Sequence, residues 1–126
     1  MTVKVALDYD GVVTKGPYVF LEVVKDFQKA GWDVTIVTMR FRNEPVIVPK
    51  EFPNLEVIYT GRKAKKPFVS ELGYTFDIWI DDHPQLILMD AFEPDPEDKH
   101  SKNKWDDPKW EDYRSSHYSA DFVTYE

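Results

Sequence analysis

Two pairs of aspartates are the residues of this chain best suited to chemistry. Asp8 and Asp10 lie two residues apart directly after a short apolar run, and Asp81 and Asp82 directly follow another. Carboxylates held this close together repel each other unless a cation or a shared proton lies between them. Mg²⁺ prefers such oxygen ligands and usually takes only one or two carboxylates from a protein. The two pairs therefore predict a magnesium site.

The apolar segments that lead to these aspartates are typical of buried strands. Residues 3–7 and 76–80 are short and rich in apolar side chains, as central strands of a parallel sheet usually are. Gly11 allows the tight turn by which the chain leaves the first strand. The other elements that we expect, in chain order, are a helix at 19–30, a strand at 32–38, a loop at 39–53 with a short extended piece at 46–48, a strand at 55–60, a helix at 67–73, a short helix at 84–90, a small helix at about 108–115 and a terminal strand at 120–125.

The order of these elements predicts the fold class. A strand, a helix and a strand within about forty residues form a βαβ unit, whose two strands are parallel. We therefore expect an α/β fold with a three-layer, Rossmann-like open parallel sheet of about five strands. A length of 126 residues fits a single domain, 1–126, in which residues 92–119 form an irregular insertion rich in acidic and aromatic side chains.

Composition narrows the class further. The chain has no cysteine, which excludes disulfides and zinc–thiolate sites, and it has no apolar run long enough to span a membrane. We therefore expect a cytoplasmic protein without a membrane partner. A formal net charge of −7 argues against binding of nucleic acid over the whole surface. Residues 40–66 nevertheless carry seven basic and three acidic side chains, which suggests an anionic substrate on one side only.

Polar and charged residues follow four of the expected strands. In open parallel sheets, ligands bind outside the carboxyl ends of the strands, so these residues should converge on one site. They are Asp8 with Asp10, Thr38, the basic run RKAKK at 62–66, and Asp81 with Asp82.

In this order the four signals resemble the motifs of the haloacid dehalogenase-like superfamily of phosphohydrolases. DYDGVVT is similar to the first motif, and Thr38 at the end of VTIVT is similar to the second. Lys65 or Lys66 matches the lysine of the third motif, and IWIDD is similar to the fourth. The resemblance covers roughly residues 3 to 90, and it implies a haloacid dehalogenase-like fold without a cap domain.

The resemblance also implies a phosphohydrolase that acts on a phosphomonoester. Asp8 would be the nucleophile and form an aspartyl-phosphate. Asp10 would be the general acid toward the leaving group and then the base for the attacking water. The Thr38 hydroxyl would bind a phosphoryl oxygen, and Lys65 or Lys66 would offset negative charge.

By the same resemblance, Mg²⁺ is the expected cofactor. Its ligands would be the Asp8 carboxylate, the main-chain carbonyl of Asp10, and Asp81 or Asp82. Candidate contacts to the phosphorylated substrate are Gly11, Thr38, Met39 and Arg40.

Two alternatives stay open at this point. An open site and a basic segment would suit a phosphatase that processes the 5′ or 3′ ends of nucleic acids, whereas a small phosphomonoester would suit a site covered by residues 92–119. A non-catalytic metal-binding module, with the acidic and aromatic segment as its docking surface, belongs to a different class.

Overall fold

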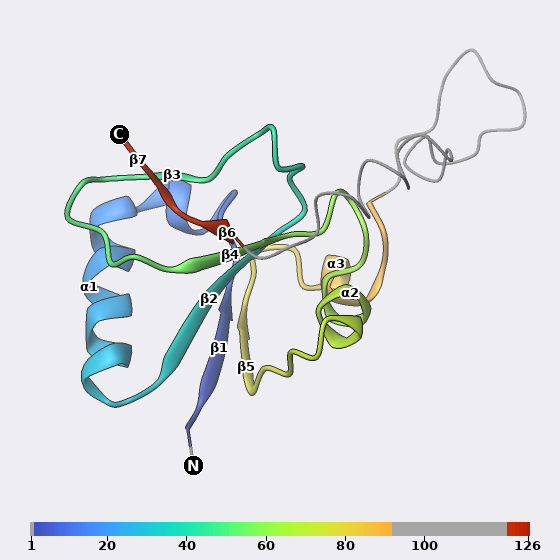
Figure 1. The fold of residues 1–126 in the computed structure, drawn as a ribbon, viewed down its shortest axis with the longest axis horizontal. Helices are drawn as coiled ribbons and strands as arrows, with labels where there is room; N and C mark the ends of the chain where they lie inside the picture. Colours follow the sequence, from blue (N-terminus) through green and yellow to red (C-terminus); the bar gives the residue numbers. More distant parts are fainter. Residues whose placement is uncertain (1, 92–120) are drawn as a thin grey trace, which may run out of the picture.

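A central sheet carries the site, and its strands are the apolar runs of the sequence. The computed structural model describes residues 2–91 and 121–126, to which the following statements refer. Four parallel strands lie in the order β5-β1-β2-β4, and β6 pairs with β4 in the antiparallel direction (Figure 1). Their bounds are β1 Lys4–Leu7, β2 Asp33–Thr38, β4 Glu56–Tyr59, β5 Ile78–Ile80 and β6 Asp121–Phe122. A second, two-stranded parallel sheet pairs β3 (Ile47–Val48) with β7 (Thr124–Tyr125).

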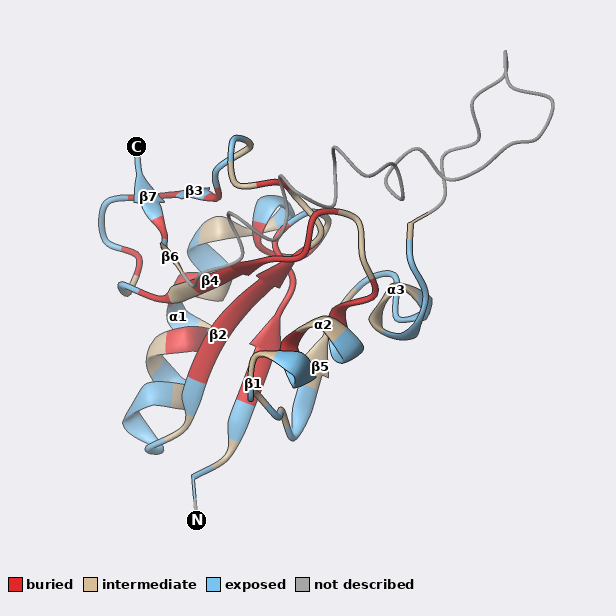
Figure 2. Ribbon diagram, turned by 45° about the vertical axis from the view of Figure 1, so that its right-hand side comes forward, coloured by how far each residue is buried: buried red, intermediate tan, exposed pale blue. Residues whose placement is uncertain are grey.

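Helices cover both faces of the central sheet (Figure 1). They are the 3-10 helix η1 Val13–Lys15, α1 Pro17–Lys29, α2 Lys65–Glu71 and α3 Gln85–Leu88. Alternation along each strand sends side chains to opposite faces. Val5 and Leu7 of β1 therefore pack in the cluster that includes Val24 of α1, whereas Ala6 packs in the cluster that includes Val69 of α2. The central strands are consequently the most deeply buried part of the described chain (Figure 2).

The expectation of an α/β fold is confirmed at this level. The structure is a mixed α/β fold with a mostly parallel five-stranded sheet, and it is compatible with a Rossmann-like arrangement. The expectation of one terminal strand at 120–125 is wrong, because the strand is interrupted at the buried residue Val123. Its N–H bonds to the Leu55 carbonyl, and that of Thr124 bonds to Val46. The two halves therefore join different sheets, and β6 is antiparallel.

Two helices begin earlier than the sequence predicts. The first helix is expected from residue 19 but begins at Pro17, where the missing N–H and fixed φ of proline are tolerated. The second helix was expected from Pro67 but begins at Lys65. There Asp90, 26 residues away, accepts the N–H of the N-cap residue Ala64 at 2.7 Å, a contact that no local pattern could reveal.

The expected helix at 108–115 and the expected insertion at 92–119 lie outside the described residues. No helix in the described part of the chain is both long and apolar enough to cross a membrane.

Candidate active site

The register of the sheet brings the two aspartate pairs together. Leu7 at the end of β1 pairs with Ile80 at the end of β5, so the aspartates that follow emerge side by side. The Asp8 N–H donates to the carbonyl of Ile80 at 2.9 Å, which ties the two strand ends directly. The convergence predicted from strand order therefore holds for Asp8, Asp81 and Asp82.

Three carboxylates form a compact cluster at this edge. One oxygen each from Asp8, Asp81 and Asp82 lies within 4.8 Å of the others. The side chains of Asp8 and Asp81 are buried, and that of Asp82 is partly exposed. A set of hard oxygen donors at this spacing could hold a divalent cation, and it fits the preference of Mg²⁺. The carboxylate of Asp10 does not belong to the cluster.

The structure distinguishes the two candidate lysines. Lys65 lies in the first turn of α2 and is 3% exposed. Its ammonium donates to Asp8 Oδ1 at 2.8 Å and to Asp81 Oδ2 at 2.6 Å. Lys66 is exposed on the same helix and makes no ion pair with any residue that the structure describes. Lys65 is therefore the lysine that this fold brings to Asp8.

Burial is the main influence on the charge of Asp8. Removal from water raises the pKa of the Asp8 carboxyl to about 7, although the ammonium of Lys65 acts in the opposite direction. The neighbouring carboxyl groups of Asp81 and Asp82 act in the same direction as burial, and a pKa of about 7 is the net result of all these influences. In the absence of a cation, a proton on Asp8 thus relieves the repulsion within the cluster.

Stability without metal should therefore depend on pH. The pKa of Asp8 is about 7 in the folded chain and close to 3.8 when unfolded, so between these values the folded state binds more protons. We expect the melting temperature of chelator-treated protein to fall as the pH rises through that window. Added Mg²⁺ should reverse the fall, because metal binding displaces the proton.

The matched control for this pH dependence is Asp8→Asn, which has no titrating group at residue 8. Its melting temperature should change less over the same pH range. An identical slope in the two proteins would show that Asp8 is not the source.

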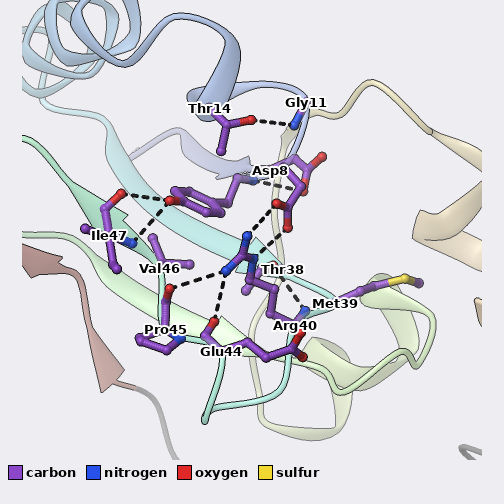
Figure 3. Close-up of polar contacts among 12 residues, drawn as sticks. Asp8, Gly11, Thr14, Thr38, Met39, Arg40, Glu44, Pro45, Val46 and Ile47 are labelled. Carbon is purple, nitrogen blue, oxygen red and sulfur yellow. Dashed lines mark hydrogen bonds and ion pairs between the residues drawn. The ribbon is translucent and has the colours of Figure 1, made fainter.

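Gly11 leaves room for Asp82. Its φ is +81°, and a Cβ at this position would lie 2.1 Å from Asp82 Oδ2. Its N–H donates to the Thr14 hydroxyl at 2.9 Å (Figure 3). The N–H of Gly11, an expected substrate contact, is therefore already bonded within the turn. The absence of a side chain at Gly11 leaves the space that the Asp82 carboxylate occupies in the cluster.

The consequence can be tested with two glycines that share one backbone conformation. Gly31 also has a φ of +81°, but a Cβ there meets nothing within 4 Å. Ala at either position should cost about 1–2 kcal/mol from the left-handed backbone alone. Only Gly11→Ala should also displace Asp82, so it alone should weaken Mg²⁺ binding measured by calorimetry. Equal Mg²⁺ affinities in the two variants would contradict this account.

A small cavity lies over the cluster. Its volume is about 110 Å³, and it is lined by Asp8, Asp10, Thr38, Met39, Lys65, Asp81, Asp82, His83 and Leu86. Larger cavities of about 570 and 490 Å³ occur elsewhere, at the amino ends of the strands and beside α2. We place the candidate site in the small cavity because the three carboxylates and Lys65 converge there.

Thr38 and Met39, at the end of β2, line the small cavity. Thr38 is buried, and its hydroxyl accepts the N–H of Arg40 at 3.2 Å (Figure 3). The carbonyl of Met39 accepts the N–H of Arg62 at 2.8 Å and its side-chain Nη1 at 2.7 Å. Both expected substrate contacts therefore lie in the cavity lining, and the loop that follows β2 is tied down at each.

Most basic side chains of the basic segment, residues 40–66, are paired with acids of the same chain. The salt bridges are Arg40–Asp10 at 2.8 Å, Arg42–Asp121 at 3.0 Å, Arg62–Glu44 at 3.3 Å and Lys63–Asp90 at 3.4 Å. Much of the charge that suggested an anionic partner is thus already paired internally. Arg40 in particular, an expected substrate contact, is bonded to Asp10.

Two residues outside the motifs support the site. His83 donates its N–H to Asp81 Oδ1 at 2.9 Å, and its Nδ1 lies 3.1 Å from Asp82 Oδ2. Its position directly after the aspartate pair marks it in the sequence, but a histidine there is more often a loop residue than a ligand. Asp90 caps the start of α2 but gave no signal, because its partner Ala64 is distant in the sequence.

Comparisons with known proteins leave the site to be judged on its own geometry. No family model matches the chain, and no significant match was found among curated proteins or among solved structures.

Proposed function

We propose that this protein is a Mg²⁺-dependent phosphohydrolase of the haloacid dehalogenase-like type, which hydrolyses a phosphomonoester through an aspartyl-phosphate on Asp8. The observation that carries the proposal is the bridge from Lys65 to Asp8 and Asp81, beside Asp82, at the carboxyl ends of parallel strands. Phosphoryl transfer depends mainly on positioning and on neutralisation of charge. A buried lysine between two carboxylates, next to a third, supplies both.

Asp8 is suited to attack because its carboxylate is held in place. Its Oδ1 accepts two hydrogen bonds, from Lys65 at 2.8 Å and from the N–H of Tyr9 at 2.9 Å. In the first step an Asp8 oxygen attacks phosphorus, the bond to the leaving group breaks, and Asp10 gives the leaving oxygen a proton. In the second step Asp10 takes a proton from water, which attacks phosphorus and releases phosphate from Asp8.

The three carboxylates of the cluster would have two roles: two would bind the metal, and the third would hold Lys65. Both oxygens of Asp81 already accept hydrogen bonds, from Lys65 and from the N–H of His83. Mg²⁺ usually keeps several waters, so the more exposed carboxylate of the pair, that of Asp82, suits it better than the buried Asp81. We assign the metal to the carboxylates of Asp8 and Asp82 and to the main-chain carbonyl of Asp10. When bound there, Mg²⁺ would offset the negative charge of the phosphoryl group.

The size of the cavity limits which part of the substrate can enter it. A volume of about 110 Å³ suits a phosphoryl group, so the rest of the substrate would lie outside it. The internal pairing of the basic segment gives no preference for nucleic-acid ends over small phosphomonoesters. Substrate size is thus an outcome of the test.

The test is hydrolysis by purified protein with Mg²⁺ and with chelator. Substrates should include an aryl phosphate, a mononucleotide, and oligonucleotides phosphorylated at the 5′ or 3′ end. We expect phosphate release that requires Mg²⁺. Mg²⁺ binding in calorimetry without turnover of any of these substrates would contradict the proposal and favour the non-catalytic module.

A further inference from the structure

Arg40 and Asp10 form a two-pronged ion pair beside the candidate site. Nε of Arg40 lies 2.8 Å from Asp10 Oδ2, and Nη2 lies 2.8 Å from Oδ1. Two parallel N–H···O bonds fix the orientation of a carboxylate as well as its position. The pairing follows from the sheet, because β1 and β2 are parallel neighbours and both residues lie just beyond their carboxyl ends. Asp10 lies three residues after the end of β1, and Arg40 lies two residues after the end of β2.

The other side of the Arg40 guanidinium is held by the loop that follows β2. Nη1 lies 3.4 Å from the carbonyl oxygen of Glu44 and 3.5 Å from that of Pro45 (Figure 3). The N–H of Arg40 donates to the Thr38 hydroxyl. Backbone and side chain are therefore anchored independently of Asp10.

The aromatic ring of Tyr9 packs against the guanidinium of Arg40. The guanidinium carbon lies 4.9 Å from the centre of the Tyr9 ring, within the range of a cation–π contact. The Tyr9 hydroxyl is fixed in turn, since it donates to the Ile47 carbonyl at 2.8 Å and accepts the Ile47 N–H at 3.3 Å. The guanidinium of Arg40 is thus ordered by Tyr9 and by the loop carbonyls, which do not line the cavity.

This ordering changes what the ion pair can do. Exposed ion pairs usually contribute little, because two flexible side chains must both be fixed. Here the side chain of Arg40 is 30% exposed and already anchored, whereas that of Asp10 is 55% exposed. The arginine therefore fixes the aspartate.

The same contacts argue against Arg40 as a ligand of the substrate phosphate. The edge formed by Nε and Nη2, which could grip a phosphate in two places, is used by Asp10. Each oxygen of Asp10 keeps a second lone-pair direction for another hydrogen bond. Asp10 can therefore serve a leaving group or a water while Arg40 holds it.

We propose that Arg40 is a positioning residue for Asp10, holding the carboxylate that transfers protons in place beside Asp8. This inference rests on the proposed function. It replaces the expectation that Arg40 contacts the substrate.

The test compares Asp10→Asn, Arg40→Gln and the double variant on a series of aryl phosphates whose leaving groups differ in basicity. Arg40→Gln should lower kcat roughly 10- to 100-fold, within the range of coupling between contacting residues. Its losses across the series should follow those of Asp10→Asn. The double variant should be no slower than Asp10→Asn alone, because both changes remove one function.

Binding measurements separate positioning from substrate contact. In Arg40→Gln, KM and the Kd for inorganic phosphate should stay within about twofold of wild type, since the change acts on a catalytic step. Arg40→Lys should resemble Arg40→Gln, because lysine keeps the charge but lacks the planar fork. Arg42→Gln is the matched control, since it removes another ion-paired arginine of the same loop. It should retain the wild-type kcat.

Two results would overturn the inference while leaving the proposed function intact. One is a rise in KM and phosphate Kd with an unchanged kcat. The other is a double variant whose loss is the product of the two single losses. Melting temperatures of all variants should be measured, to show that no loss of activity comes from unfolding. A wild-type protein that releases no phosphate with Mg²⁺ would remove the proposed function and this inference together.

Discussion

Replacement of Asp8 by Asn is expected to lower kcat for aryl phosphate hydrolysis by on the order of 10⁴-fold or more, to the background rate. The amide cannot form the acyl-phosphate, but its oxygen can still accept hydrogen bonds from Lys65 and from the N–H of Tyr9. The fold should therefore survive. Chelator-treated Asp8→Asn at neutral pH should melt no lower than wild type, because the buried carboxylate has gone.

The control for this loss is an aspartate far from the site. Asp26 lies exposed on α1, and Asp26→Asn should leave kcat and the Mg²⁺ requirement unchanged. Phosphate release by Asp8→Asn at the wild-type rate would remove Asp8 from the mechanism.

Replacement of Lys65 by Met is expected to lower activity strongly while strengthening metal binding. Removal of the buried ammonium leaves Asp8 and Asp81 without their cation, which should cost about 3–5 kcal/mol of metal-free stability at pH values above the pKa of Asp8. The cluster then carries more negative charge, so Mg²⁺ should bind more tightly and restore more stability than in wild type. Hydrolysis should still fall roughly 100-fold or more, because the ion does not replace the lysine beside Asp8.

Lys66→Met provides the matched control on the same helix. Lys66 is exposed, so its loss should leave both kcat and the affinity for Mg²⁺ close to wild type. If instead Lys66→Met is the inactive variant, then the lysine that serves the site is not the one that the fold buries.

Much of the sheet and of the aspartate cluster could be predicted because the signals are local. Each parallel strand of the central sheet lies in a short apolar run, and each aspartate pair directly follows one, so parallel order alone brings Asp8 and Asp82 together. The two-residue strands at the C-terminal end carry too few side chains for a period to emerge. Their direction is set by hydrogen bonds with the distant segments at Leu55 and Val46.

The choice between the two lysines could not be made from sequence for a similar reason. Whether Lys65 or Lys66 points inward depends on where α2 begins, and Asp90 helps to set that point from beyond α3. The Arg40–Asp10 ion pair could not be predicted for a different reason. A basic residue after a strand suits a substrate contact equally well, and only the contacts of Arg40 with Tyr9 and with the loop carbonyls favour a partner within the chain.

The most direct test of the central claim is capture of the phosphoryl group on Asp8. Asp10→Asn should slow the release of phosphate from the intermediate, so that protein quenched in acid after exposure to radiolabelled aryl phosphate and Mg²⁺ retains label. The account predicts label that hydroxylamine removes, as from an acyl-phosphate, and that maps to Asp8. Chelator or the added change Asp8→Asn should abolish it. Label that persists in Asp8→Asn, or that maps to another residue, would contradict the account.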